Sequence, residues 1–190
     1  TQNYGFGIIW GLKDVDNCYE FKISDNGYYM YGNYTNGSWN STIDWTLSSY
    51  ITTDNSTNRL KISKEGSMVS FYVNDYYLNT ATASSFFGGK FGFVVGPTEK
   101  IEIDNLTVTK LASQNKTNYT TQTANSNNYF QDDFSSNSNN WYQVNDNEKY
   151  QQVEYGNYVM ENKTSVTALA STIEFPSSVS STGEIGRAHV

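Results

Sequence analysis

Short segments of alternating apolar and polar residues, separated by glycine and asparagine, dominate this sequence. They recur about every ten residues between Asn3 and Phe175, which is typical of the strands of a β-sandwich. Hairpin signals such as Asp25-Asn26-Gly27 and Thr35-Asn36-Gly37 lie between them. No segment carries a convincing helical period. The sequence therefore predicts an all-β fold, an antiparallel, jelly-roll-like β-sandwich.

The alternation also predicts where the strands lie and which way their side chains point. The expected strands are 3–12, 18–24, 27–34, 39–45, 58–64, 67–74, 76–80, 90–95, 100–109, 129–134, 141–144, 150–154, 158–162, 166–170 and 171–175. Tyr29 and Tyr31 should share one face of their strand. Tyr28 and Met30 should share the opposite face. We expect one of these two faces to be buried.

Large aromatic residues supply the core of the predicted sandwich. The chain holds sixteen tyrosines and ten phenylalanines. We expect Trp10, Trp141 and the single cysteine, Cys18, to lie inside, and Tyr4 to share the face of Trp10. One cysteine cannot form an internal disulfide.

The charge balance narrows the range of partners. Lys and Arg number 12 against 19 Asp and Glu, which gives a formal net charge of −7. A nucleic-acid binder normally carries a basic surface, so we expect no nucleic-acid partner. No apolar run approaches the ~18 residues of a membrane-spanning helix, so we expect no membrane span either.

A polar stretch, 112–128, divides the chain and is predicted to be a flexible linker. It separates residues 1–111 from residues 129–183, and the second segment is too short to bury a core alone. The final residues, 184–190, can be encoded by GAG ATC GGA AGA GCA CAC GTC, which matches a common sequencing-library adapter. We therefore interpret them as an artefact of adapter read-through and exclude them from the predicted fold.

Several runs between Tyr4 and Val108 match one family in order and spacing: GFGIIWGLKDVDNCYEFKISDNGYYMYG, NRLKISKEGSMVSFYVN, GKFGFVV and IEIDNLTV. Together they resemble concanavalin A-like (laminin-G-like) β-sandwich domains, the lectin and glucanase relatives that include the 3-keto-disaccharide hydrolase family. The runs DDFS, NNW and YGNYV in 129–183 are similar to the opening of such a domain.

The resemblance implies a fragment of a tandem-repeat bacterial protein. Residues 1–111 would be the C-terminal two-thirds of one repeat, and residues 129–183 would be the N-terminal third of the next. We expect the second segment to pack on the first and complete its sandwich as a circular permutant.

Catalytic signals are incomplete. Residues 102–107 read E-x-D-x-x-T, which is similar to the E-x-D-x-x-E motif of family 16 glycoside hydrolases, but Thr107 stands where the acid belongs. The only histidine, His189, lies in the excluded tail, so no Ser-His-Asp triad is predicted. We predict no catalytic residue and no cofactor.

Metal binding has two candidate positions, both with a simpler interpretation. Asp14 and Asp16, with Asn17, are oxygen donors of the kind that calcium takes, and Asp132-Asp133 form a second acidic pair. Three side chains fall short of a full calcium shell. A turn between strands is the favoured interpretation, and we predict no metal.

The aromatic side chains remain as candidate ligand-binding groups, because sugars stack their C–H faces on rings. The candidate glycan platform consists of Tyr29, Tyr31, Asn33, Tyr34, Trp39 and Trp45. The alternative is that alternation buries about half of these rings in the core.

We expect a non-catalytic carbohydrate-binding, adhesion or spacer module, located outside the cell or at its surface. The alternative is a glycoside hydrolase-like enzyme. A pair of carboxylates about 5–10 Å apart in an open groove would favour the enzyme.

Overall fold

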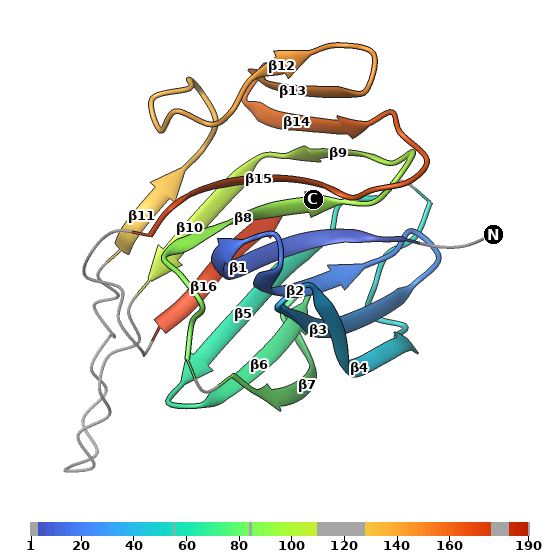
Figure 1. Cartoon of the computed structure of the whole chain (residues 1–190), viewed down its shortest axis with the longest axis vertical. Helices are drawn as coiled ribbons and strands as arrows, with labels where there is room; N and C mark the ends of the chain where they lie inside the picture. Colours follow the sequence, from blue (N-terminus) through green and yellow to red (C-terminus); the bar gives the residue numbers. More distant parts are fainter. Residues whose placement is uncertain (1–3, 55, 84, 110–127, 176–182, 190) are drawn as a thin grey trace.

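Every regular element in the described residues of the chain is a β-strand (Figure 1). The computed structural model describes residues 4–54, 56–83, 85–109, 128–175 and 183–189. The strands are β1 (Phe6–Asp14), β2 (Asn17–Ile23), β3 (Tyr28–Thr35), β4 (Ser38–Leu47), β5 (Arg59–Glu65), β6 (Met68–Val73), β7 (Tyr76–Thr82), β8 (Lys90–Val95), β9 (Lys100–Ile103), β10 (Asn105–Thr109), β11 (Asn128–Asp132), β12 (Val144–Asn145), β13 (Lys149–Glu154), β14 (Asn157–Asn162), β15 (Leu169–Glu174) and β16 (Gly183–His189). All strand pairs are antiparallel, which confirms the predicted all-β sandwich. The described residues contain no helix able to cross a membrane.

Two six-stranded sheets enclose the main core. The first has the order β15-β8-β1-β2-β3-β4, and the second has the order β11-β10-β16-β5-β6-β7. Phe21 and Tyr31 of the first sheet contact Phe71 of the second, with ring centroids 4.9 and 4.5 Å apart. Trp10 is buried beside them, as predicted. A third sheet of four strands, β12-β13-β14-β9, completes the fold.

Three hairpins close with two-residue turns in which both residues have positive φ. The pairs are Asn36-Gly37 (50° and 76°), Asn74-Asp75 (51° and 68°) and Tyr155-Gly156 (52° and 78°). Type I′ turns require this combination, and their twist matches that of the paired strands. Asn, Asp and Gly tolerate positive φ better than other residues do. The turn predicted at Thr35-Asn36-Gly37 is confirmed.

The strands after residue 127 join sheets that the earlier strands begin. β11 pairs with β10, β14 with β9, and β15 with β8. In Figure 1, β12, β13 and β14 lie at the top of the view, next to β9. Phe134, Trp141 and Tyr158 are 0–2% exposed, so Trp141 is buried as predicted. That 129–183 began as a segment of another repeat stays a prediction.

The expected strand 100–109 is instead two strands in different sheets. Ile101 and Ile103 are buried, and so are Leu106 and Val108. These two pairs differ in parity, so one uniform strand cannot bury both. The chain changes sheets at Asp104, where β9 ends and β10 begins.

Three further expected strands differ. The boundary between the expected strands 166–170 and 171–175 lies inside the single strand β15 (Leu169–Glu174), which pairs continuously with β8. Of 141–144, only Val144 is in a strand, because Trp141 enters the core from a loop. The Asn137 side chain accepts a hydrogen bond from the Trp141 amide at 2.8 Å and holds that loop in place.

We expected the C-terminal residues to lie outside the fold, but they form a strand within it. The backbone of Gly183–His189 forms β16 and pairs with β10 on one side and β5 on the other. An extended backbone of any sequence can fill such a slot, because the pairing groups are N–H and C=O. The adapter origin of 184–190 stays a prediction. The predicted linker 112–128 lies outside the described residues except for Asn128, where β11 begins.

Candidate functional site

A groove of about 710 Å³ lies on the outer face of the first sheet, over β2, β3 and β4. Its walls are mainly aromatic. The lining residues are Tyr4, Lys22, Ser24, Asn26, Tyr28, Met30, Tyr34, Trp39 and Trp45. A volume of this size lies in the range of small-molecule and oligosaccharide clefts.

Alternation along β2 and β3 decides which side chains reach the groove. Tyr29 and Tyr31 are 5% and 1% exposed and belong to the core. Tyr28, Met30 and Tyr34 point to the outer face and line the groove. The prediction that Tyr29 and Tyr31 contribute to a glycan platform is therefore wrong, because their faces pack between the two sheets.

Asn33 is also absent from the groove lining. Its side-chain Nδ2 donates a hydrogen bond to Thr35 Oγ1 at 2.7 Å. Of the predicted platform, the structure brings together Tyr34, Trp39 and Trp45.

Two β-bulges in β4 turn Ile43 inward while both tryptophans stay on the outer face. By simple alternation, Trp39, Ile43 and Trp45 would share one face. The register instead shifts between the pairs Gly32–Ser41, Tyr31–Ile43 and Tyr29–Thr46, with one extra residue on β4 each time. Ile43 consequently packs on the core while the rings on either side line the groove. Bulges commonly re-aim side chains in this way at sheet edges.

Glycine makes room for each tryptophan ring. A Cβ on Gly32 would lie 2.4 Å from Trp39 Cζ2, and a Cβ on Gly5 would lie 2.5 Å from Trp45 Cη2. The Trp39 ring therefore lies close against the backbone of β3, and the Trp45 ring lies close against the backbone just before β1. Tyr34 adds a third ring, 4.9 Å from Trp39 between centroids.

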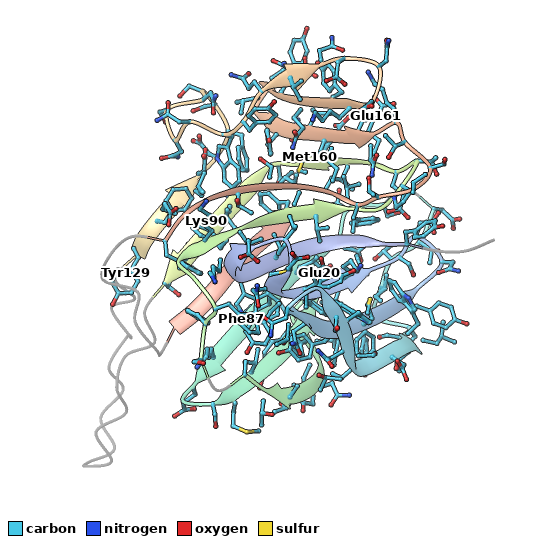
Figure 2. All side chains as sticks on the ribbon, in the orientation of Figure 1. Glu20, Phe87, Lys90, Tyr129, Met160 and Glu161 are labelled. Atoms are coloured by element: carbon cyan, nitrogen blue, oxygen red, sulfur yellow. The ribbon has the colours of Figure 1, made fainter. Side chains whose placement is uncertain are left out.

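One ion pair contributes to the groove floor. Lys22 Nζ lies 2.9 Å from Glu20 Oε2, and the two side chains are only 15% and 7% exposed. The same ammonium lies 5.7 Å from the centroid of the Trp39 ring, within the range of a cation–π contact. Glu20, labelled in Figure 2, is not among the residues that line the groove. Its charge is neutralised locally, so the floor presents little net charge to a ligand.

The outer face also contains a small buried apolar cluster beside the groove. Ile9, Leu12, Cys18 and Val94 form it, and Tyr34 packs against it. Burial, and to a lesser degree the charge of Glu20, raises the pKa of the Cys18 thiol to about 12. The thiol is therefore protonated and unreactive at neutral pH.

The carboxylates of the hydrolase-like run do not line the groove. Glu102 is exposed on β9 and pairs with Lys100 at 3.0 Å. Asp104 lies at the point where the chain changes sheets, and Thr107 donates a hydrogen bond to Asn105 Oδ1 at 3.2 Å. Among the described residues, those that line the groove include no Asp or Glu.

The acidic candidates for metal binding lie at strand ends and in the residues just after them. Asp14 Oδ1 accepts hydrogen bonds from the Asp16 amide at 3.1 Å and from Asn17 Nδ2 at 2.8 Å. Asp132 is buried, and its carboxylate accepts three hydrogen bonds, including one from Trp141 Nε1 at 2.7 Å. Within the described ranges, no cluster of three or more His, Cys, Asp or Glu residues could hold a metal ion.

Six lining residues were not predicted: Tyr4, Lys22, Ser24, Asn26, Tyr28 and Met30. Tyr28 and Met30 could have been predicted, because alternation places them on the face opposite the buried tyrosines. Tyr4 was expected to share the face of Trp10, but Gly5 has a φ of +67° and turns the chain just before β1.

No protein-family model matches the sequence, and no curated protein matches it.

Proposed function

We propose that this chain is a non-catalytic carbohydrate-binding module that holds a neutral oligosaccharide in the groove over β2, β3 and β4. One observation carries the proposal: Trp39 and Trp45, from a single strand, both line one groove although Ile43 between them is turned inward. Two bulges are needed for this arrangement.

The chemistry of the lining suits a sugar. Pyranose rings present flat C–H faces that stack on indole and phenol rings. Their hydroxyls need donors and acceptors, which Asn26 and Tyr28 supply along the groove. The Lys22 ammonium, already paired with Glu20, adds a donor without a large net positive charge.

The spacing of the tryptophans favours a chain of sugars over a single one. Trp39 and Trp45 are six positions apart on β4, which corresponds to roughly 20 Å along an ideal strand and somewhat less with bulges. One pyranose ring cannot contact both. We therefore expect affinity to rise with the number of sugar units until both rings are covered.

The alternative is an enzyme that acts on sugar linkages, as the resemblance to hydrolase-containing families implies. A retaining or inverting hydrolase needs two carboxyl groups at the scissile bond. The groove lining offers Lys22, hydroxyls, an amide and rings, which supports binding rather than hydrolysis. We place the protein outside the cell or at its surface, where such a module meets polysaccharides.

The test is calorimetric titration with cellohexaose, xylohexaose, laminarihexaose and maltohexaose, each beside its disaccharide. We expect at least one hexasaccharide to bind and its disaccharide to bind more weakly. Trp39→Ala and Trp45→Ala should each weaken binding by about tenfold or more. Tyr76→Ala is the matched control, since this ring is 55% exposed but lies on the second sheet.

Two results would contradict the proposal. One is that none of the four hexasaccharides binds, and the other is that both tryptophan variants bind as the parent does. Release of shorter sugars during incubation, followed by chromatography, would favour the enzyme instead.

A further inference from the structure

A second cleft, of about 390 Å³, is bordered by the same two chain segments as the groove. In the turn between β2 and β3, Asn26 lines the groove and Asp25 lines the cleft. Around the start of β1, Tyr4 lines the groove and Phe6 lines the cleft. Neighbouring Cα atoms are about 3.8 Å apart, so a ligand that reaches Asn26 in the groove is close to the wall of the cleft.

The turn between the two cavities is held by a buried serine. Ser24 is 0% exposed, and its Oγ donates a hydrogen bond to Asn26 Oδ1 at 2.7 Å. The same oxygen accepts a hydrogen bond from the Tyr28 amide at 3.1 Å, and the Gly27 amide donates to the Ser24 carbonyl oxygen at 3.0 Å. These bonds fix Asp25 and Asn26 before any ligand arrives, so binding at this ridge costs little ordering entropy.

The opposite wall of the cleft is also fixed in advance. Asn58 is 2% exposed, and its Nδ2 donates hydrogen bonds to the carbonyl oxygens of Thr52 at 2.7 Å and Ser56 at 3.3 Å. Its Oδ1 accepts a hydrogen bond from the Thr52 amide at 2.9 Å. The side chains of Thr52, Thr53, Ser56 and Thr57 line the cleft. A hydroxyl can both donate to and accept from the hydroxyls of a sugar, so this wall suits a sugar ring.

The charged side chains of the cleft favour a neutral ligand. Asp25, Lys100 and Glu102 line it, and Lys100 Nζ lies 3.0 Å from Glu102 Oε1. Carboxylates accept hydrogen bonds from sugar hydroxyls, and the ammonium donates one. An anionic sugar would meet two carboxylates against one ammonium and would be repelled. The cleft therefore suits the same uncharged sugars as the groove.

The two cavities lie on different sides of the first sheet. Lys22 and Met30 line the groove on the outer face. Phe6 packs against the main core and Ile101 belongs to that core, so the cleft reaches the inner side. A chain of sugars that occupies both cavities must bend over the turn. Chains of β-1,4-linked glucose are extended, whereas α-1,4-linked and β-1,3-linked chains curve.

We propose that the cleft is a second subsite for the glycan held in the groove, and that this glycan is a curved, neutral oligosaccharide that bends over the Asp25-Asn26 turn. The inference rests on the proposed function, because it requires a sugar chain in the groove. The groove, at about 710 Å³, holds the larger part of the chain, and the cleft holds one end of it.

The test is calorimetric titration of the parent, Glu102→Ala and Thr57→Ala with maltohexaose, laminarihexaose and cellohexaose. We expect a curved hexasaccharide to bind the parent more tightly than cellohexaose does. Each of the two variants should weaken binding of that curved ligand by about three- to tenfold, through loss of a hydrogen bond, and leave any binding of cellohexaose unchanged. Glu174→Ala is the matched control, since its carboxylate also pairs with a lysine, Lys90, at 3.8 Å but lines neither cavity.

The outcomes separate this inference from the proposed function. If Trp39→Ala and Trp45→Ala weaken hexasaccharide binding while Glu102→Ala and Thr57→Ala bind as the parent does, the second subsite is overturned and the groove stands. Tighter binding of cellohexaose than of either curved chain would also overturn it, and so would an equal loss in Glu174→Ala. If none of the hexasaccharides binds, both proposals fall together.

Discussion

The inner and outer faces of β2, β3 and β4 hold similar aromatic residues that serve different ends. On the inner face, Tyr31 is 1% exposed and contacts the rings of Trp10, Tyr19 and Phe71. On the outer face, Trp39 keeps some of its ring accessible and has one aromatic neighbour, Tyr34. The comparison teaches that the number of aromatic rings along a strand does not identify a binding surface. The number of sides on which each ring is packed identifies it.

The largest expected effect comes from the inner face. Tyr31→Ala should lower the free energy of unfolding by about 4 kcal/mol, because it leaves a cavity between the two sheets. Urea denaturation followed by tryptophan fluorescence measures this. Tyr31→Phe is the control: the buried hydroxyl has no hydrogen-bond partner in the described structure, so its removal should leave stability unchanged or raise it. A Phe variant as unstable as the Ala variant would show that the hydroxyl, and not the ring, matters.

The ion pair between Lys22 and Glu20 should give the next largest effect. Lys22→Met leaves the Glu20 carboxylate, which is 5% exposed, without its ion-pair partner. We expect a loss of about 3 kcal/mol in unfolding free energy. The double variant Glu20→Leu with Lys22→Met should recover most of it, because an apolar pair needs no partner. Equal instability of the single and double variants would contradict this account.

A smaller effect is expected where the outer face meets the backbone. Gly32→Ala puts a Cβ 2.4 Å from the Trp39 ring and 2.6 Å from the Asn40 carbonyl oxygen. We expect a loss of about 1–3 kcal/mol and a displaced Trp39 ring, seen as a shift in fluorescence and weaker sugar binding. Gly89→Ala is the control, because its Cβ meets only the flexible end of Glu174 at 3.3 Å. Equal effects of the two substitutions would mean that the contact with Trp39 is unimportant.

The smallest change tests whether Tyr34 covers the outer apolar cluster. Burial raises the pKa of Cys18 to about 12, so its thiol should react slowly with iodoacetamide at pH 8 in the folded parent. Tyr34→Ala removes the ring that packs on this cluster and should speed the reaction several-fold. Mass spectrometry at timed intervals measures the rate, with Tyr76→Ala as the control. An unchanged rate would show that residues other than Tyr34 shield Cys18 from the reagent.

Much of the fold could be predicted because local signals act over a few residues. Alternation along 27–34 correctly separated Tyr29 and Tyr31 from Tyr28 and Met30. The Asn36-Gly37 turn followed from residues that tolerate positive φ. Three of the six predicted platform residues share one groove, because crowded rings are visible in the sequence, whereas the face that becomes buried is not.

The errors arose where a strand departs from uniform alternation. Neither bulge of β4 has a sequence signature, because each depends on how β4 matches the twist of β3. The break at Asp104 could have been predicted, because the apolar positions are odd-numbered up to Ile103 and even-numbered from Leu106. The pairing of β14 with β9 joins residues more than fifty positions apart, and no local pattern specifies such a partner.

Sequence alone determined that this chain forms antiparallel strands with aromatic side chains between them, because side-chain period and turn chemistry are local properties. Only the tertiary structure decided which rings stay accessible and which segment completes which sheet. Both depend on register between distant strands, where a shift of one residue turns a buried ring into a groove wall.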